Sequence, residues 1–80
     1  MKINWYVQIP RFNGGAVHPR YWQIISAEEG SEQDEICRTE MIRNGCGELV
    51  PTISSYWSFP NEKACARFIE RNLRIWDRRD

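Results

Sequence analysis

Residues 55–80, SYWSFPNEKACARFIERNLRIWDRRD, decide the fold. An alternating aromatic segment runs into Pro60, and Asn61 supplies a side chain that is favoured at the N-cap of a helix. The segment that follows has one apolar face at helical spacing, made of Cys65, Phe68, Ile69, Leu73 and Trp76. We therefore expect a strand that ends at Phe59, followed by a long amphipathic helix whose apolar face packs on a sheet.

Three segments before this helix have strand patterns. Residues 2–9, KINWYVQI, alternate between two faces, and Pro10 is expected to end that strand. Residues 20–27, RYWQIISA, form a second strand, which pairs antiparallel with the first across a loop that contains an NGG turn. Residues 49–59, LVPTISSYWSF, form a third strand, and Pro51 places its start at a sheet edge or a bulge.

Residues 31–50, SEQDEICRTEMIRNGCGELV, have two interpretations. In the first, Ser31 is the N-cap of a helix, Asp34 occupies the capping-box position and Gly45 lies just past the helix end. In the second, EICRTEMIR is a strand that turns through Asn44-Gly45, because Asn-Gly is a strong hairpin signal. The apolar residues fit neither pattern well. The turn directly before residues 49–59 favours the strand.

The expected fold is α+β, with an antiparallel sheet of three or four strands and one long C-terminal amphipathic helix packed on one face. If residues 32–43 are helical, the order of elements becomes ββαβα. The 80 residues form a single domain, residues 1–80, because a chain of this length has no room for a second core.

The composition limits the class of protein. Hydrophobic residues make up 41% of the chain and aromatic residues 12%, which argues against disorder. No apolar run approaches the roughly 18 residues of a membrane span, and the N-terminus lacks the apolar stretch of a signal peptide, so we expect a cytoplasmic protein. The odd set of Cys37, Cys46 and Cys65 predicts reduced thiols, and neither a metal site nor a cofactor is expected.

The sequence carries no catalytic signature. His18 is the only histidine and lies in a proline-bounded loop, while Cys46 lies in a glycine-flanked turn. No phosphate-binding loop, zinc-binding helix or nucleophile-elbow motif occurs. A chain of this size also has little room for the deep pocket that small substrates usually need. We therefore predict a binding protein and not an enzyme.

Two surfaces are predicted to bind a protein partner. The first is the acidic run EEGSEQDE, which carries five carboxylates and no basic residue: Glu28, Glu29, Glu32, Asp34 and Glu35. Such a run can imitate a phosphate track and occupy a basic groove of a nucleic-acid-handling complex. The second is the sheet face left open by the helix, with aromatic rings among small polar residues: Tyr6, Trp22 and Tyr56.

The outer face of the C-terminal helix is the alternative site. Arginines recur along it at spacings of four, three and four residues: Arg67, Arg71, Arg74 and Arg78. Guanidinium groups form bidentate contacts with phosphate, so a nucleic-acid-binding module is the second hypothesis. The net charge of zero weakens the attraction to nucleic acid and ranks this hypothesis below protein binding.

In size, fold class and lack of catalytic chemistry, the chain is similar to the small inhibitors of phages and mobile elements, including anti-CRISPR proteins. The similarity is one of class and not of a family motif. It implies an accessory or inhibitor protein that acts by occupying the surface of a partner. An exposed strand edge or sheet face also allows a homodimer through isologous pairing.

Overall fold

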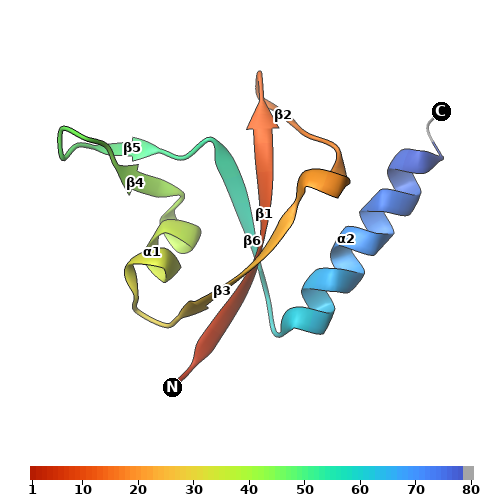
Figure 1. The fold of residues 1–80 in the computed structure, drawn as a ribbon, viewed down its shortest axis with the longest axis horizontal. Helices are drawn as coiled ribbons and strands as arrows, with labels where there is room; N and C mark the ends of the chain where they lie inside the picture. Colours follow the sequence, from red (N-terminus) through yellow and green to blue (C-terminus); the bar gives the residue numbers. More distant parts are fainter. Residues whose placement is uncertain (79–80) are drawn as a thin grey trace.

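The central strand, β1 (Ile3–Phe12), organises the structure, a computed structural model that describes residues 1–78. It pairs antiparallel with β3 (Gln23–Glu28) on one side and with β6 (Ser54–Phe59) on the other. A short strand, β2 (Gly15–Ala16), folds back on the end of β1, as Figure 1 shows. The predicted antiparallel pairing of the first two long strands is confirmed.

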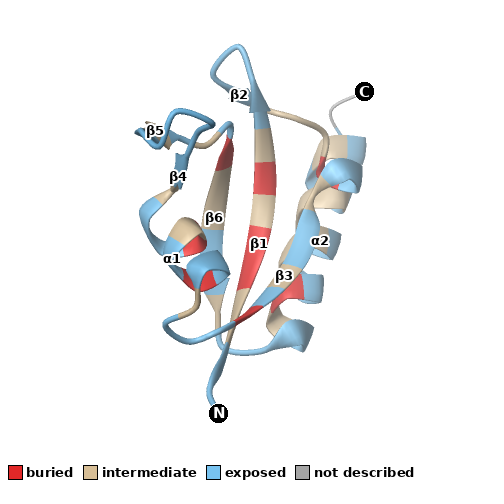
Figure 2. Ribbon diagram, turned by 60° about the vertical axis from the view of Figure 1, so that its left-hand side comes forward, coloured by how far each residue is buried: buried red, intermediate tan, exposed pale blue. Residues whose placement is uncertain are grey.

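One helix covers each face of this sheet. α2 (Glu62–Asp77) lies on one side and α1 (Glu32–Thr39) on the other (Figures 1 and 2). A single 3-10 turn, η1 (Pro19–Tyr21), packs against α2. A separate hairpin of β4 (Met41–Arg43) and β5 (Leu49–Pro51) extends beyond α1. The α+β class, the antiparallel sheet and the long C-terminal helix are as predicted.

β1 is buried on both faces because successive side chains of a strand point to opposite sides. Val7 and Ile9 face α2 and pack with Cys65 in one buried cluster. Tyr6 points the other way and packs with Cys37 of α1 in a second cluster. The core therefore consists of two thin layers, one on each side of the sheet, and Figure 2 shows the buried positions along β1 between the two helices.

The packing of α2 follows its sequence pattern. Asn61 caps the helix, since its side-chain oxygen accepts a hydrogen bond from the N–H of Ala64 at 2.8 Å. Phe68 lies at the centre of an aromatic group in which three rings have centroids 5.6, 5.9 and 4.9 Å from its own: Trp22, Trp57 and Phe59. Large aromatic area compensates for the small number of fully buried residues in a short chain.

The prediction that Pro10 ends the first strand is wrong. β1 continues through Pro10 to Phe12, and Pro10 lies opposite Ser54 in the register with β6. Pro10 has no N–H to donate. Backbone pairing nevertheless continues with the residue just before β6, because the N–H of Arg11 donates to the carbonyl of Ile53 at 3.0 Å. A proline is tolerated in a strand where the ladder needs no donor from it.

The favoured strand interpretation of residues 35–43 is wrong for most of its length, and the helical alternative is confirmed over Glu32–Thr39. Ser31 is the predicted N-cap, since its hydroxyl accepts a hydrogen bond from the N–H of Asp34 at 3.2 Å. Three carboxylates in the first turn interact favourably with the positive end of the helix dipole. The helix ends at Thr39, and Glu40 caps it in the left-handed conformation with φ 59°.

The Asn-Gly signal marks a real hairpin that is shorter than expected. Its turn spans residues 44–48, where the Asn44 side-chain oxygen accepts hydrogen bonds from the N–H groups of Cys46 and Glu48 at 2.8 and 3.0 Å. Gly45 therefore lies in this turn and does not end the helix. The order of the long elements is ββαβα, with the hairpin inserted before the last long strand.

Replacing Phe68 with Ala should lower the free energy of unfolding by about 3 kcal/mol, because it removes the ring on which three other rings pack. Urea denaturation measures this change. Ala66→Ser, on the exposed side of the same helix, is the control and should change stability by less than about 0.5 kcal/mol. A Phe68→Ala cost as small as that of the control would contradict the packing of α2.

Candidate functional site

The carboxylate of Asp34 fastens α1 to the sheet. It is fully buried, with 0% of the residue exposed, and it accepts four hydrogen bonds. One oxygen accepts from the Tyr6 hydroxyl at 2.6 Å and from the Asn4 amide at 3.0 Å, both on β1. The other accepts from the N–H of Gly30 at 3.0 Å and from Nε of Arg38 at 3.2 Å. α1 is thereby tied to the central strand and to the turn that precedes it.

These hydrogen bonds shift the pKa values of Asp34 and Tyr6 and so set their protonation states. The hydrogen bond from Tyr6, followed by those from Asn4 and Gly30, holds the pKa of Asp34 well below its usual range, against the opposing effect of burial. Burial, and then the contact with the carboxylate, raises the pKa of Tyr6 to about 12. At neutral pH Asp34 is therefore ionised and Tyr6 is protonated.

A groove of about 340 Å³ lies between α1 and the β4–β5 hairpin. α1 contributes four residues that recur at helical spacing: Glu32, Glu35, Ile36 and Thr39. The hairpin contributes Met41, Ile42, Arg43 and Leu49. Asp34 is not among the lining residues, because its carboxylate is turned toward β1. Fixing Asp34 on the sheet therefore directs the other side of α1 toward the groove.

The groove is lined by exposed apolar side chains and by charged ones, two glutamates and Arg43. In the hairpin register Ile42 lies opposite Val50 and Leu49 lies opposite Arg43, so Ile42 and Leu49 belong to opposite faces of the hairpin. Ile42 is 41% exposed and Leu49 is 57% exposed, although such side chains are usually buried. Glu32 and Glu35, which we call the acidic rim, are both exposed and have no ion pair with any residue in the described part of the chain. Apolar contact area bordered by free charge is typical of a recognition surface.

Glu40 holds the hairpin beside α1. Its carbonyl accepts a hydrogen bond from the N–H of Thr52 at 2.8 Å, just after β5. Its carboxylate accepts a second from the N–H of Tyr56 on β6 at 3.0 Å. Both walls of the groove are therefore connected to the edge of the main sheet.

The structure separates the five carboxylates that were predicted to form one acidic surface. Glu32 and Glu35 remain together at the groove. Glu28 is exposed at the end of β3, and Glu29 forms an ion pair of 3.5 Å with a lysine near the N-terminus. Asp34 is buried, so the expectation that its carboxylate faces a partner is wrong. It lies on the side of α1 that is turned to the sheet.

The open sheet face that was predicted to present Tyr6, Trp22 and Tyr56 does not exist as one surface. Tyr6 is only 4% exposed beneath α1, and Tyr56 is half-buried beside it. Trp22 lies on the other side of the sheet, stacked on Phe68. The expectation failed because residues 32–39 form a second helix, which covers the face assumed to be open.

The four predicted arginines do share one exposed face of α2, on the opposite side of the sheet from the groove: Arg67, Arg71, Arg74 and Arg78. Sequence analysis missed the apolar groove residues Ile36, Ile42 and Leu49 as a site. Ile36 and Ile42 belong to a set, with Cys37 and Met41, that fitted neither one helical stripe nor one strand face, and this irregular pattern was the available signal.

Other kinds of site are not evident in the described residues. Among residues 1–78, no group of three or more His, Cys, Asp or Glu side chains is arranged to hold a metal ion. No helix in this range is long and apolar enough to cross a membrane. Comparisons with known protein families, curated proteins and solved structures found no match to this chain.

The contact between Asp34 and Tyr6 predicts losses of stability at both ends of the pH scale. Folding lowers the pKa of Asp34, so its contribution is complete above the ordinary value of 3.8 and is lost as the pH falls below it. Folding raises the pKa of Tyr6 from 10.0 to about 12, so its contribution is complete below pH 10.0 and is lost as the pH rises toward 12. Urea denaturation across both ranges measures these losses.

Asp34→Asn should reduce the loss on the acid side of this profile. Tyr6→Phe should reduce the loss on the alkaline side but not abolish it, because burial also raises the pKa values of Tyr56, Cys37 and Cys65. Tyr21→Phe is the matched control, because Tyr21 is exposed and contacts neither group. An alkaline loss in Tyr6→Phe equal to that of the wild type would show that Tyr6 does not titrate in this contact.

Proposed function

We propose that this protein is a non-enzymatic protein-binding module whose groove receives a basic, amphipathic segment of a partner. The proposal rests on one observation, a groove lined both by exposed apolar side chains, Ile42 and Leu49, and by the acidic rim of Glu32 and Glu35. A partner segment with apolar side chains on one face and Lys or Arg beside them matches both features. Helical segments bind apolar grooves of other proteins in this way.

The apolar lining and the acidic rim would make different contributions to binding. Seating an apolar side chain of the partner in the groove removes apolar area from water on both partners, which supplies affinity at about 25 cal/mol per Å². The acidic rim is exposed to solvent and screened by salt, so it acts mainly on the association rate and on the choice of partner. Affinity should therefore depend more on Leu49 than on either glutamate.

In its narrower form, the proposal makes the partner a component of a nucleic-acid-handling complex, since the surfaces of such complexes are rich in Lys and Arg. The protein would then act as an accessory or inhibitor that occupies the partner's surface, as its similarity in size and class to phage and mobile-element inhibitors suggests. We place this activity in the cytoplasm, where its three free cysteines remain reduced.

The direct test uses a fluorescently labelled synthetic helix of about 18 residues, five turns, with Leu on one face and Lys on the other. Fluorescence anisotropy gives its dissociation constant. Leu49→Ser should weaken binding about tenfold, because it removes an apolar anchor. Glu32→Gln combined with Glu35→Gln should weaken binding at low salt and reduce its salt dependence.

Two matched controls define the site. Glu28→Gln combined with Glu29→Gln removes the same charge outside the groove, and Ile53→Ser removes an exposed apolar side chain that does not line it. Neither control should change the dissociation constant. Equal losses of affinity from both glutamate pairs would indicate that the peptide is attracted to the acidic end as a whole and not to the groove. Equal losses of affinity from Ile53→Ser and Leu49→Ser would refute binding in the groove.

A further inference from the structure

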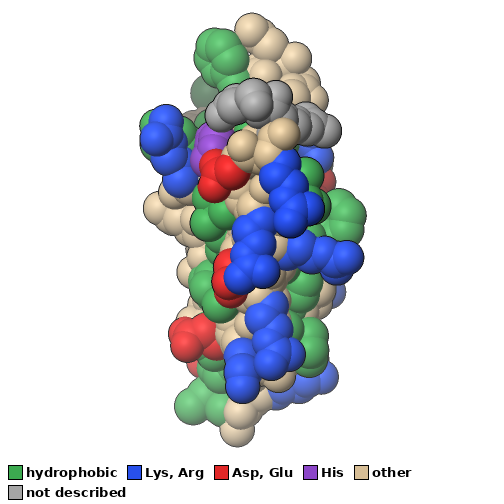
Figure 3. Space-filling model, turned by 90° about the vertical axis from the view of Figure 1, so that its right-hand side faces the viewer, with side chains coloured by type: hydrophobic (Ala, Val, Ile, Leu, Met, Phe, Trp, Pro, Cys, Tyr) green, Lys and Arg blue, Asp and Glu red, His purple; other side chains and the backbone are tan. Residues whose placement is uncertain are grey.

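α2 carries a strip of positive charge on the face that points away from the sheet. Five exposed basic residues form this arginine strip: Lys63, Arg67, Arg71, Arg74 and Arg78. The four arginines border a shallow hollow along the helix, together with Glu70 and Ile75. Figure 3 shows the strip as a column of basic side chains that follows the helix from end to end.

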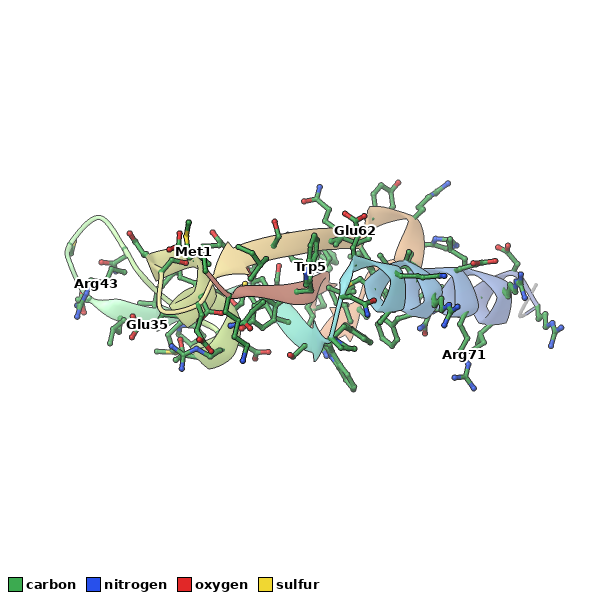
Figure 4. The ribbon with its side chains drawn as sticks, turned by 90° about the horizontal axis from the view of Figure 1, so that it is seen from below. Met1, Trp5, Glu35, Arg43, Glu62 and Arg71 are labelled. Carbon is green, nitrogen blue, oxygen red and sulfur yellow. The ribbon has the colours of Figure 1, made fainter. Side chains whose placement is uncertain are left out.

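Most of this charge is available to a ligand. Arg74 is paired with Glu70 at 2.7 Å, whereas Arg67, Arg71 and Arg78 have no ion pair among the described residues. Figure 4 shows Arg71 pointing away from the helix. α2 itself carries three carboxylates, Glu62, Glu70 and Asp77, so residues 62–78 keep a net charge of +2. The acidic residues of α1 lie across the sheet, and screening limits charge interactions to about 8 Å at physiological salt.

An exposed aromatic ring flanks the arginine strip. Trp57 on β6 stacks on Phe68 of α2 with ring centroids 5.9 Å apart and an interplanar angle of 23°, yet Trp57 is 54% exposed. Arg71 and Ile75 follow Phe68 by three and seven residues, so they lie on the same side of the helix as Phe68. The stacking contact therefore places the exposed indole ring on the side of α2 that carries Arg71 and Ile75.

We propose that the arginine strip and Trp57 together form a binding surface for single-stranded nucleic acid. Guanidinium groups of Arg67, Arg71 and Arg78 bind backbone phosphates, and the exposed face of Trp57 accepts an unpaired base by stacking. A duplex hides its base faces within the stack, so the aromatic ring favours a single strand. An acidic protein would engage the arginines alone, without any need for Trp57.

This inference does not depend on the groove. Figure 4 shows Arg43, on the hairpin that lines the groove, and Arg71, on α2, toward opposite ends of the molecule. The two surfaces also differ in charge, because two glutamates and one arginine line the groove, whereas four arginines and one glutamate line the hollow on α2. Each can therefore be tested by variants that leave the other intact.

The test measures anisotropy of a labelled oligothymidylate of about 12 nucleotides with the full chain, at about 50 mM and about 200 mM salt. Arg67→Ala combined with Arg71→Ala should weaken binding about fivefold at the lower salt. The same variant should reduce the slope of log affinity against log salt by about 1.4, or 0.7 for each lost phosphate contact. Trp57→Ala should weaken binding about fivefold or more, and Trp57→Phe should retain most of it.

Lys2→Ala combined with Arg20→Ala is the charge-matched control outside the strip and should bind like the wild type. Circular dichroism checks that every variant is folded. The proposal is overturned if the control loses as much affinity as the strip variant, or if Trp57→Ala binds like the wild type. It is also overturned if polyglutamate displaces the labelled strand as readily as unlabelled oligothymidylate, which would assign the strip to acidic proteins.

Discussion

The buried carboxylate of Asp34 is the constraint on which the rest of the structure depends. An ionised group removed from water is costly unless its oxygens are fully hydrogen-bonded. Here the donors come from β1, from the turn before α1 and from the next turn of α1 itself. They can converge only if α1 lies against β1. That placement closes the second layer of the core and turns Glu32 and Glu35 toward the hairpin.

Because each sheet face is covered by a helix, the surfaces suited to recognition lie at the ends of a molecule 43 Å long. The groove lies beyond α1, and the arginine strip lies on the outside of α2. The net charge of zero is therefore the sum of an acidic end, at α1, and a basic end, at α2. Under the two proposals, these ends bind different partners. The acidic end would contact protein, and the basic end would contact single-stranded nucleic acid.

Local signals predicted most of the fold. The cap at Asn61 and the apolar face of α2 were evident, and so was the pairing of β1 with β3. α1 was only the less favoured interpretation, because Ser31 signalled a helix while Asn44-Gly45 signalled a hairpin. Each signal proved correct over a different range. The deciding contact joins Asp34 to Tyr6, 28 positions away. Alternation shows which residues share a face, but it cannot show whether a second helix covers that face.

The most direct test of this account is a double-mutant cycle on Asp34 and Tyr6, read as the free energy of unfolding in urea at neutral pH. Tyr6→Phe is measured in the wild type and again in Asp34→Asn. The account predicts that removing the hydroxyl is much less destabilising once the carboxylate is gone, well beyond the scatter expected of independent sites. Equal costs in the two backgrounds would contradict the claim that this contact fastens α1 to the sheet.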